Sequence, residues 1–278
     1  MGRRARPRAD RPGGRGGIPL TPRHDVAHRL PIPFDAEREL AELREYLGDD
    51  YDHSRIEAWQ EQLDREADEV GDEQRLYRVS EGYLYNLTVF ALSETKLPYV
   101  ADLVEHVPPG ARLLDYGCGI GSDGLYLLEA GYRVEFADFD NPSTRYLRWR
   151  LARRGLEARI YDLDRETPPG GFDLAYAFDV IEHVDDPFGF LERMEAAARL
   201  VLVNLLEEDP DDTALHRDLP IAAVLGRARE RRLLRYRVYW DRSHTVLYRS
   251  AGGSTADRLA SLAALAAGRA RRARDRRR

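Results

Sequence analysis

The sequence predicts an α/β fold, a doubly wound seven-stranded sheet with an antiparallel last strand, preceded by an N-terminal helical cap. Two observations lead to this prediction. From about residue 112, short apolar runs alternate with amphipathic helical segments, which is the pattern of a parallel sheet covered by helices on both faces. Only Asp241, Arg242 and Ser243 separate the last two predicted strands, so these strands should form an antiparallel hairpin, because a parallel crossover needs a longer connection.

Composition and periodicity divide the chain into four segments. The first is rich in Arg, Gly and Pro and has little to bury, so we expect a disordered basic tail. The second has helical apolar spacing and many tyrosines, which predicts the helical cap. The third holds the alternating strands and helices, and the fourth is a basic Ala/Arg-rich tail that should be partly helical. The predicted boundaries are 1–33, 34–97, 98–250 and 251–278.

Each element is predicted from its apolar pattern. The cap should hold helices at 34–47 and about 56–70, then one or two helices at 74–97 that cover the pocket of the sheet. The predicted strands lie near 112–116, 133–138, 157–161, 173–178, 199–205, 234–240 and 244–249. The predicted helices of the sheet domain lie near 98–107, 121–130, 142–154 and 186–197, and a short helix with Leu259, Leu262 and Leu265 should follow in the tail.

Charge is distributed unevenly along the 278 residues, whose formal net charge is −6. Both ends are rich in arginine, whereas the middle is acidic. Such ends can be arms that bind nucleic acid or simply solvated tails. Arginine outnumbers lysine 42 to 1, which indicates the codon bias of a G+C-rich genome and favours solvated tails.

No apolar run approaches the roughly 20 residues that a membrane helix needs, and no apolar region follows the twin arginines near the start. We therefore expect a cytoplasmic protein without a membrane partner. The single cysteine, Cys118, excludes an internal disulfide and a cysteine-cluster zinc site. Its place between two glycines favours a small residue that fits a turn over a reactive thiol. The oligomeric state is not predictable from these features.

A glycine-rich turn follows the first predicted strand and is the most informative segment. Asp115 ends an apolar run, and Gly117, Gly119 and Gly121 follow at every second position before an amphipathic helix begins. Glycines let a backbone approach a ligand closely, and open α/β folds bind ligands at the carboxyl edge of the sheet. A carboxylate at this edge favours a cationic ligand.

A dinucleotide is the competing ligand. The loop also spells G-x-G-x-x-G from Gly119 to Gly124, and Asp138 stands about the right distance downstream to bind a ribose. That pattern alone is weak, Gly117 already interrupts the strand, and Asp115 would repel a pyrophosphate. An NAD(P)-dependent oxidoreductase is therefore the weaker alternative.

The whole Asp-x-Gly-x-Gly-x-Gly pattern resembles the first motif of the class I (Rossmann-like) methyltransferases, which use S-adenosylmethionine. This donor carries a sulfonium and an ammonium but no phosphate, so an acidic glycine loop suits it. The resemblance implies that Asp115 holds the ammonium of the donor, directly or through water, beside Gly117, Gly119 and Gly121. A seven-stranded sheet with a reversed last strand is also the architecture of that class.

Two further acids follow the next two predicted strands. Asp138 ends the second strand, where a carboxylate can accept from both ribose hydroxyls, and Asp140 is the alternative if the register shifts by two. The resemblance implies that Asp162, after the third strand, accepts from the adenine amino group, with Asp164 as the competing residue. It also implies that the backbone N–H of Leu163 donates to the adenine ring.

The segment Asp179-Val-Ile-Glu182-His183 is similar to the one that follows the fourth strand in ubiquinone-biosynthesis O-methyltransferases and many small-molecule methyltransferases. The resemblance places Asp179 at the methionine end of the donor and His183 beside the methyl group, where an imidazole can take a proton from a hydroxyl. Glu182 and His183 stay open to three interpretations: acid–base or substrate-positioning groups, structural groups that order the loop, or, with Asp179, ligands of Mg²⁺ or Zn²⁺. The metal is not the favoured one. His216 and His244 are secondary candidates for substrate contact.

Together the motifs predict an S-adenosylmethionine-dependent methyltransferase that acts on a small-molecule acceptor, with a hydroxyl oxygen favoured and His183 as the candidate base. A catalytically inactive donor-binding scaffold or partner subunit is the alternative from a different class. A nucleic-acid acceptor is disfavoured. The chain lacks the Asn/Asp-Pro-Pro-Tyr/Phe motif of amino-methylating DNA enzymes, which argues against that class of enzymes but not against all RNA substrates. The sequence does not identify the acceptor.

Overall fold

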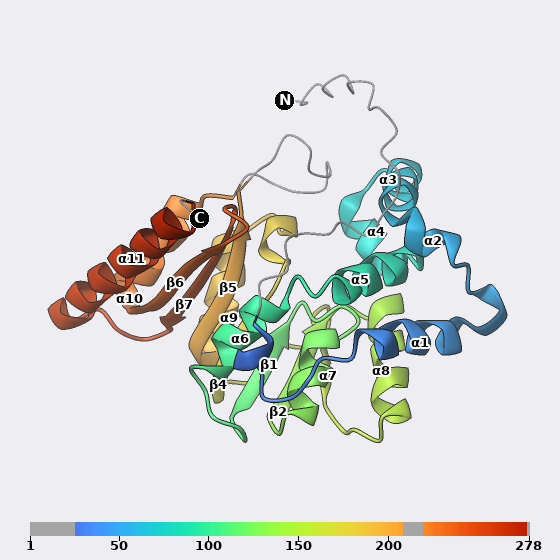
Figure 1. Cartoon of the computed structure of the whole chain (residues 1–278), viewed down its shortest axis with the longest axis horizontal. Helices are drawn as coiled ribbons and strands as arrows, with labels where there is room; N and C mark the ends of the chain where they lie inside the picture. Colours follow the sequence, from blue (N-terminus) through green and yellow to red (C-terminus); the bar gives the residue numbers. More distant parts are fainter. Residues whose placement is uncertain (1–25, 208–218, 277–278) are drawn as a thin grey trace.

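A seven-stranded sheet forms the centre of the computed structural model, which describes residues 26–207 and 219–276 (Figure 1). The strand order is β3-β2-β1-β4-β5-β7-β6, and β7 runs antiparallel to both of its neighbours. The strands are β1 (Arg112–Tyr116), β2 (Arg133–Asp138), β3 (Ile160–Asp162), β4 (Phe172–Ala177), β5 (Ala198–Leu206), β6 (Leu233–Tyr239) and β7 (Ser243–Arg249). The predicted doubly wound sheet with an antiparallel last strand is confirmed.

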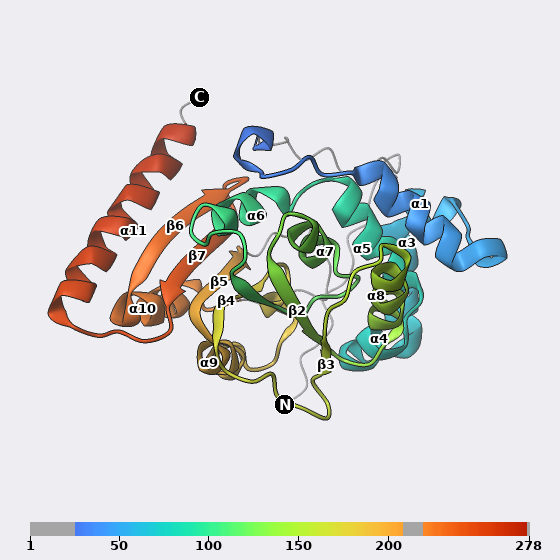
Figure 2. The ribbon, with the colours of Figure 1, turned by 90° about the horizontal axis from the view of Figure 1, so that it is seen from below.

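Helices cover both faces of the sheet, so alternate residues of each strand enter different cores (Figure 2). Leu113, Phe136 and Tyr176 pack toward α6, α7 and α8, whereas Leu114 and Ala175 pack toward α9, α10 and α11. These helices are α6 (Leu97–Val104), α7 (Ser122–Glu129), α8 (Pro142–Arg153), α9 (Pro187–Ala197), α10 (Ile221–Arg231) and α11 (Thr255–Asp275).

The helical cap lies at the end of the molecule opposite α10 and α11 (Figure 1). Leu43, Leu84 and Val89 of the cap pack against Ile120 of the glycine loop and Tyr146 of α8. The cap therefore rests on the elements that form the carboxyl edge of the sheet. Its helices are α1 (Ala36–Leu47), α2 (Ser54–Glu57), α3 (Trp59–Val70), α4 (Glu73–Val79) and α5 (Gly82–Leu92).

The predicted hairpin between β6 and β7 is present. Trp240 and Asp241 adopt φ values of 47° and 59°, and the N–H of Arg242 donates to the carbonyl of Tyr239 at 3.1 Å. Two successive positive φ values give the turn the twist that suits a two-stranded hairpin. The sequence was therefore right that this connection reverses the chain.

Two predicted elements are corrected. The third strand was predicted at 157–161 but occupies only Ile160–Asp162, because this edge strand has β2 as its single neighbour and pairs only with Phe136–Asp138. The tail helix was predicted to be short, yet α11 has 21 residues. Ser254 begins it with a capping box to Asp257, and helix-forming Ala and Arg residues extend it along β6.

Part of the predicted basic tail and the candidate His216 lie outside the described residues. Within residues 26–207 and 219–276, no helix combines the length and the apolar character needed to cross a membrane.

Candidate active site

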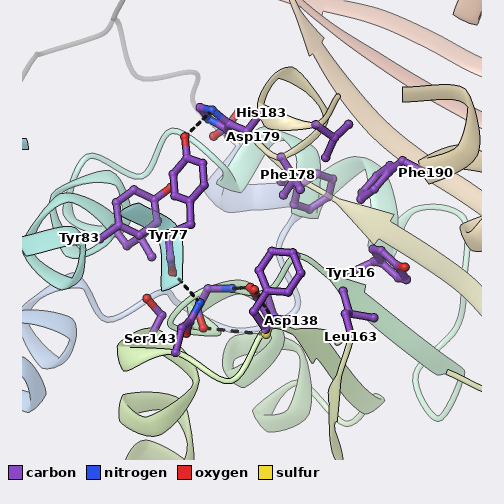
Figure 3. A pocket seen from close by; sticks show the side chains of 18 of the residues that line it. Tyr77, Tyr83, Tyr116, Asp138, Ser143, Leu163, Phe178, Asp179, His183 and Phe190 are labelled. Carbon is purple, nitrogen blue, oxygen red and sulfur yellow. Dashed lines mark hydrogen bonds between the residues drawn. The ribbon is translucent and has the colours of Figure 1, made fainter. Parts of the chain in front are cut away.

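A cavity of about 370 Å³ opens at the carboxyl ends of β1, β2 and β4. Residues from the glycine loop, the end of β2 and the segment after β4 line it, and cap residues close it from the other side (Figure 3). Of the predicted site residues, the cavity brings together Gly117, Gly119, Asp138, Leu163, Asp179 and His183. Asp115, Gly121 and Asp162 do not line it.

The glycine loop needs glycine at its turning points. Gly117 and Gly119 have φ values of 83° and 52°, which side chains with a Cβ rarely adopt. A Cβ on Gly117 would also lie 2.6 Å from Val180, and one on Gly119 would lie 2.9 Å from Leu87. The bare backbone thus forms one wall of the cavity between the sheet and the cap.

Asp138 lies at the floor of the cavity, at the end of β2. Its carboxylate accepts from the N–H groups of Gly119 at 2.8 Å and Phe139 at 2.7 Å, so it also ties the glycine loop to β2. Burial raises its pKa. Asp140, the alternative ribose ligand, instead forms an exposed ion pair with Arg148 at 2.9 Å. The geometry favours Asp138 as the acid that faces a ligand.

Asp115 lies beneath the glycine loop. It is 5% exposed, and burial together with the neighbouring Asp123 raises its pKa well above the ordinary value. The nearby Lys96 ammonium opposes that rise in the pKa of Asp115. Asp115 can therefore reach a ligand ammonium only indirectly.

The segment after β3 differs from the expectation. Asp162 accepts from the N–H of Asp164 at 3.1 Å and pairs with Arg165 at 3.3 Å, so its carboxylate closes a turn. The N–H of Leu163, predicted to donate to adenine, donates to the carbonyl of Asp138 at 3.0 Å. It is occupied because it continues the pairing of β3 with β2, and only the side chain of Leu163 is left to face the cavity.

Asp179 follows β4 in a left-handed conformation with a φ value of 55°. Buried Asn204 on β5 fixes the position of Asp179. The side-chain oxygen of Asn204 accepts from the N–H of Asp179 at 2.8 Å, and the side-chain nitrogen of Asn204 donates to the Asp179 carboxylate at 2.6 Å. The carboxylate is thus held in one place at the cavity wall.

Lys96 is the site residue that sequence reasoning missed. It lines the cavity just before α6, donates to the carbonyl of Phe178 at 3.1 Å and lies 4.0 Å from the carboxylate of Asp179. Burial lowers the pKa of Lys96, but the carboxylates of Asp179, Asp123, Asp115 and Glu182 raise it overall, so the side chain stays a cation. The signal was present: this is the only lysine in a chain with 42 arginines.

His183 lies in a short 3₁₀ turn (Ile181–His183) after β4 and lines the cavity. Its Nδ1 is 2.8 Å from the hydroxyl of Tyr77, which comes from α4 of the cap (Figure 3). The aromatic rings of Tyr77, Tyr83 and Phe178 line the same part of the cavity. An imidazole, a carboxylate and aromatic rings therefore converge near the predicted position of the methyl group.

Glu182 is 1% exposed and points away from solvent. Neither of its carboxylate oxygens has a hydrogen-bond partner among the residues that the structure describes. Burial raises the pKa of Glu182 to about 7. The nearby His183 opposes this rise, and the carboxylate of Asp179 adds to it. Glu182 is absent from the cavity lining, so its side chain is not placed to touch a ligand.

The raised pKa of Glu182 predicts a pH-dependent stability. Between about pH 4.5 and about pH 7 the folded state keeps the proton of Glu182 while the unfolded state loses it, so stability falls as the pH rises. We expect the wild type to lose roughly 3 kcal/mol across this window relative to Glu182→Gln. Urea unfolding of both proteins at about pH 4 and about pH 8 measures this difference. An equal stability gap at both pH values would contradict it.

Three further candidates of the sequence are a metal site, His244 and Cys118, and of these Cys118 lines the cavity. In the described part of the chain, no group of three or more His, Cys, Asp or Glu side chains is arranged to hold a metal ion. His244 is buried between Tyr236 and Glu207, at 2.6 Å from each, in a different cavity beside α10 and α11. Burial raises the pKa of the Cys118 thiol well above its usual value, which makes a reactive thiolate unfavourable.

The sheet order, the antiparallel last strand and the glycine loop at the carboxyl edge define a class I, S-adenosylmethionine-dependent methyltransferase fold. The model of the family described as "Methyltransferase domain" matches residues 51–248. The chain belongs to this methyltransferase-domain family.

Individual relatives are more distant. The ribosomal protein L11 methyltransferase of Ralstonia nicotianae is 31% identical over 134 residues, which cover 46% of this chain and 43% of the relative. The ubiquinone biosynthesis O-methyltransferase of Xanthomonas campestris pv. campestris is 31% identical over 106 residues, which cover 36% and 43%. This chain thus spans less than half the length of these curated relatives. A solved O-methyltransferase family protein from Burkholderia thailandensis shares the fold, with a TM-score of 0.52 at 13% identity over 74% of each chain.

Proposed function

We propose that the chain transfers a methyl group from S-adenosylmethionine to a hydroxyl oxygen of a small molecule, with His183 as the base. The observation that supports this most is that the glycine loop, Asp138 and Asp179 share one cavity with His183. These groups come from three separate strand ends and meet where α/β folds bind their ligands. A volume of about 370 Å³ falls in the range of small-molecule sites.

Opposite charges at one end of the cavity suit the amino-acid end of the donor. We assign its ammonium to Asp179 and its carboxylate to Lys96, whose charged groups are 4.0 Å apart. Asp138 would accept from the ribose hydroxyls, and Asp115 would act on the ammonium through water. Hydrogen bonds to charged groups of this kind contribute roughly 1.5 to 3 kcal/mol each.

In the proposed reaction the acceptor oxygen attacks the methyl carbon opposite the sulfur. A C–O bond forms as the C–S bond breaks, the sulfur keeps the electron pair in S-adenosylhomocysteine, and the hydroxyl proton passes to His183. The leaving group is already good, so the protein mainly aligns the reactants and excludes water, which is worth up to roughly 7 to 11 kcal/mol. The rings of Tyr77, Tyr83 and Phe178 favour an acceptor with a flat apolar body.

Donor binding is tested by thermal unfolding. Donor at about 100 times its dissociation constant should stabilise the fold by about 2.7 kcal/mol, which raises the melting temperature by about 5 °C or more. Asp138→Asn should reduce this shift, because an amide cannot accept from both ribose hydroxyls, yet it keeps an oxygen for the glycine loop. Asp140→Asn is the matched control and should leave the shift unchanged, since Asp140 faces solvent.

No shift at millimolar donor, or an equal loss in both variants, would refute the assignment of Asp138. A shift with NADH but not with S-adenosylmethionine would restore the oxidoreductase alternative. Donor binding without release of S-adenosylhomocysteine over a panel of small hydroxylated compounds would favour an inactive scaffold.

A further inference from the structure

The Tyr77 hydroxyl provides a hydrogen-bond partner for His183 that the predicted motifs do not contain. It lies 2.8 Å from Nδ1, and the two rings meet edge to face with centroids 5.4 Å apart (Figure 3). Tyr77 belongs to the cap, 106 residues before His183 in the chain. The cap therefore contributes to the surroundings of the candidate base.

The chemistry of imidazole gives this contact a consequence. A neutral imidazole carries its proton on one nitrogen and can accept a proton only at the other. A phenol can donate or accept, so the hydrogen bond to Nδ1 is compatible with either tautomer. The tautomer that leaves Nε2 as the acceptor is the one in which Nδ1–H donates to the phenol oxygen.

We propose that Tyr77 is a positioning residue for His183: its oxygen accepts from Nδ1–H and so keeps Nε2 unprotonated to receive the proton of the acceptor. This inference rests on the proposed function of His183 as a base. Without an acceptor at Nδ1, an imidazole has no such bias toward the Nδ1–H form.

The surroundings of Tyr77 hold its hydroxyl in place. The side chain of Asn141 donates to the Tyr77 carbonyl at 3.1 Å, and Tyr83 packs against the Tyr77 ring at a centroid distance of 5.2 Å. The next residue, Arg78, pairs with Asp164 and lies 4.0 Å above the ring of Phe139. Residues that follow β2 and β3 thus fasten α4 at the place where it reaches His183.

The same arrangement links the base to the donor half of the cavity. Phe139 and Asn141 follow Asp138, which we assign to the ribose. Because α4 is held by Phe139 and Asn141 and carries Tyr77 to His183, it connects the donor-binding part of the cavity with the candidate base. A hydroxyl that is already fixed loses less conformational entropy than a mobile one when its oxygen accepts from Nδ1–H.

The test is ¹⁵N NMR of the imidazole nitrogens, which reports the tautomer without any acceptor. The protein has seven histidines, and the signals of His183 are identified by their loss in His183→Asn. At about pH 9, where an ordinary imidazole is neutral, the wild type should show His183 with Nδ1 protonated and Nε2 unprotonated. Tyr77→Phe keeps the packed ring and removes the oxygen, and the Nδ1–H form should then lose its dominance.

Another tyrosine–histidine pair, with both residues in the cap, serves as the control. The hydroxyl of Tyr51 also lies 2.8 Å from a histidine Nδ1, that of His53, but this pair is exposed and outside the cavity. Tyr51→Phe should leave the signals of His183 unchanged. The melting temperatures of both variants show whether any change in the spectrum reflects loss of structure.

A wild-type His183 protonated at Nε2 would overturn the inference, and this result needs no variant to fold. A folded Tyr77→Phe protein that keeps the Nδ1–H form would overturn it as well. The donor-induced thermal shift separates this failure from that of the proposed function. If the shift is absent while the tautomer is as expected, the donor assignment fails, and only the effect of Tyr77 on the tautomer of His183 stands.

Discussion

Replacement of the buried Arg150 by Met is expected to lower the free energy of unfolding by about 3 to 5 kcal/mol, the usual cost of removing one partner from a buried ion pair. Arg150 is 0% exposed and comes from α8. Its guanidinium pairs with Glu39 and with Glu42 at 2.8 Å on α1, and donates to the carbonyl of Ile120 at 2.9 Å. Loss of the cation would leave buried carboxylates with less compensation.

The charges of this network show why its loss is costly. Burial alone would raise the pKa of Glu42, but Arg154 and Arg150 lower it overall, so the carboxylate stays ionised inside the protein. Arg154, 5% exposed on its side chain, pairs with both glutamates and would remain in the variant. We therefore expect the lower part of the range.

Thermal unfolding measures the effect, since a domain of this size loses about 2 to 4 °C for each kcal/mol. Arg153→Met is the matched control, because Arg153 also joins α8 to α1 through Glu45 at 2.9 Å, but in an exposed pair. It should leave the melting temperature unchanged, as exposed ion pairs contribute little. Equal melting temperatures for the two variants would show that the buried network does not hold the cap on the sheet domain.

The sheet was predictable because its signals are local. Each parallel strand is a short apolar run, and the turn from Trp240 to Arg242 is too short for anything but a hairpin. The glycine loop and Asp138 were predictable for the same reason, since a strand end places them at the carboxyl edge whatever the rest of the chain does. The structure brings both to one cavity.

The contributions of the cap were not predictable in this way. Tyr77 reaches the cavity from α4, and Lys96 reaches it from the turn before α6. The position of both depends on packing between distant segments, which periodicity within a segment does not encode. The burial of Arg150 was unpredictable for a similar reason, because an arginine on an amphipathic helix is ordinarily solvated. The sequence offered a clue only for Lys96. It is the single lysine beside 42 arginines, which indicates that this position needs an ammonium group.

Two groups after β3 are placed differently from the expectation for a more local reason. A motif gives the order of residues but not the register of an edge strand. Asp162 is the last residue of β3 and lies opposite Asp138, so its carboxylate turns to Asp164 and Arg165. The N–H of Leu163 continues the same ladder. A shift of one position decides whether a group faces the cavity or the sheet.

His183→Ala is expected to lower turnover by roughly 10²- to 10⁴-fold, the usual contribution of a positioned acid or base. The donor-induced thermal shift should change little, because His183 is assigned to the acceptor proton rather than to the donor. Release of S-adenosylhomocysteine over a panel of small phenols and catechols measures turnover. His53→Ala is the matched control: it removes an exposed histidine whose Nδ1 also meets a tyrosine hydroxyl at 2.8 Å, and it should have no effect.

Three results would separate the remaining roles of His183. Unchanged turnover in His183→Ala would remove it from the mechanism. A variant that loses turnover and the donor-induced shift together would assign the His183 side chain to ordering of the loop after β4, through its contact with Tyr77 of the cap. Wild-type activity that a chelator abolishes and Mg²⁺ restores would make the carboxylates at 179 and 182 metal ligands. Glu182 is buried, and Asn204 holds the carboxylate of Asp179. Binding of a metal by both carboxylates would therefore require the loop after β4 to rearrange.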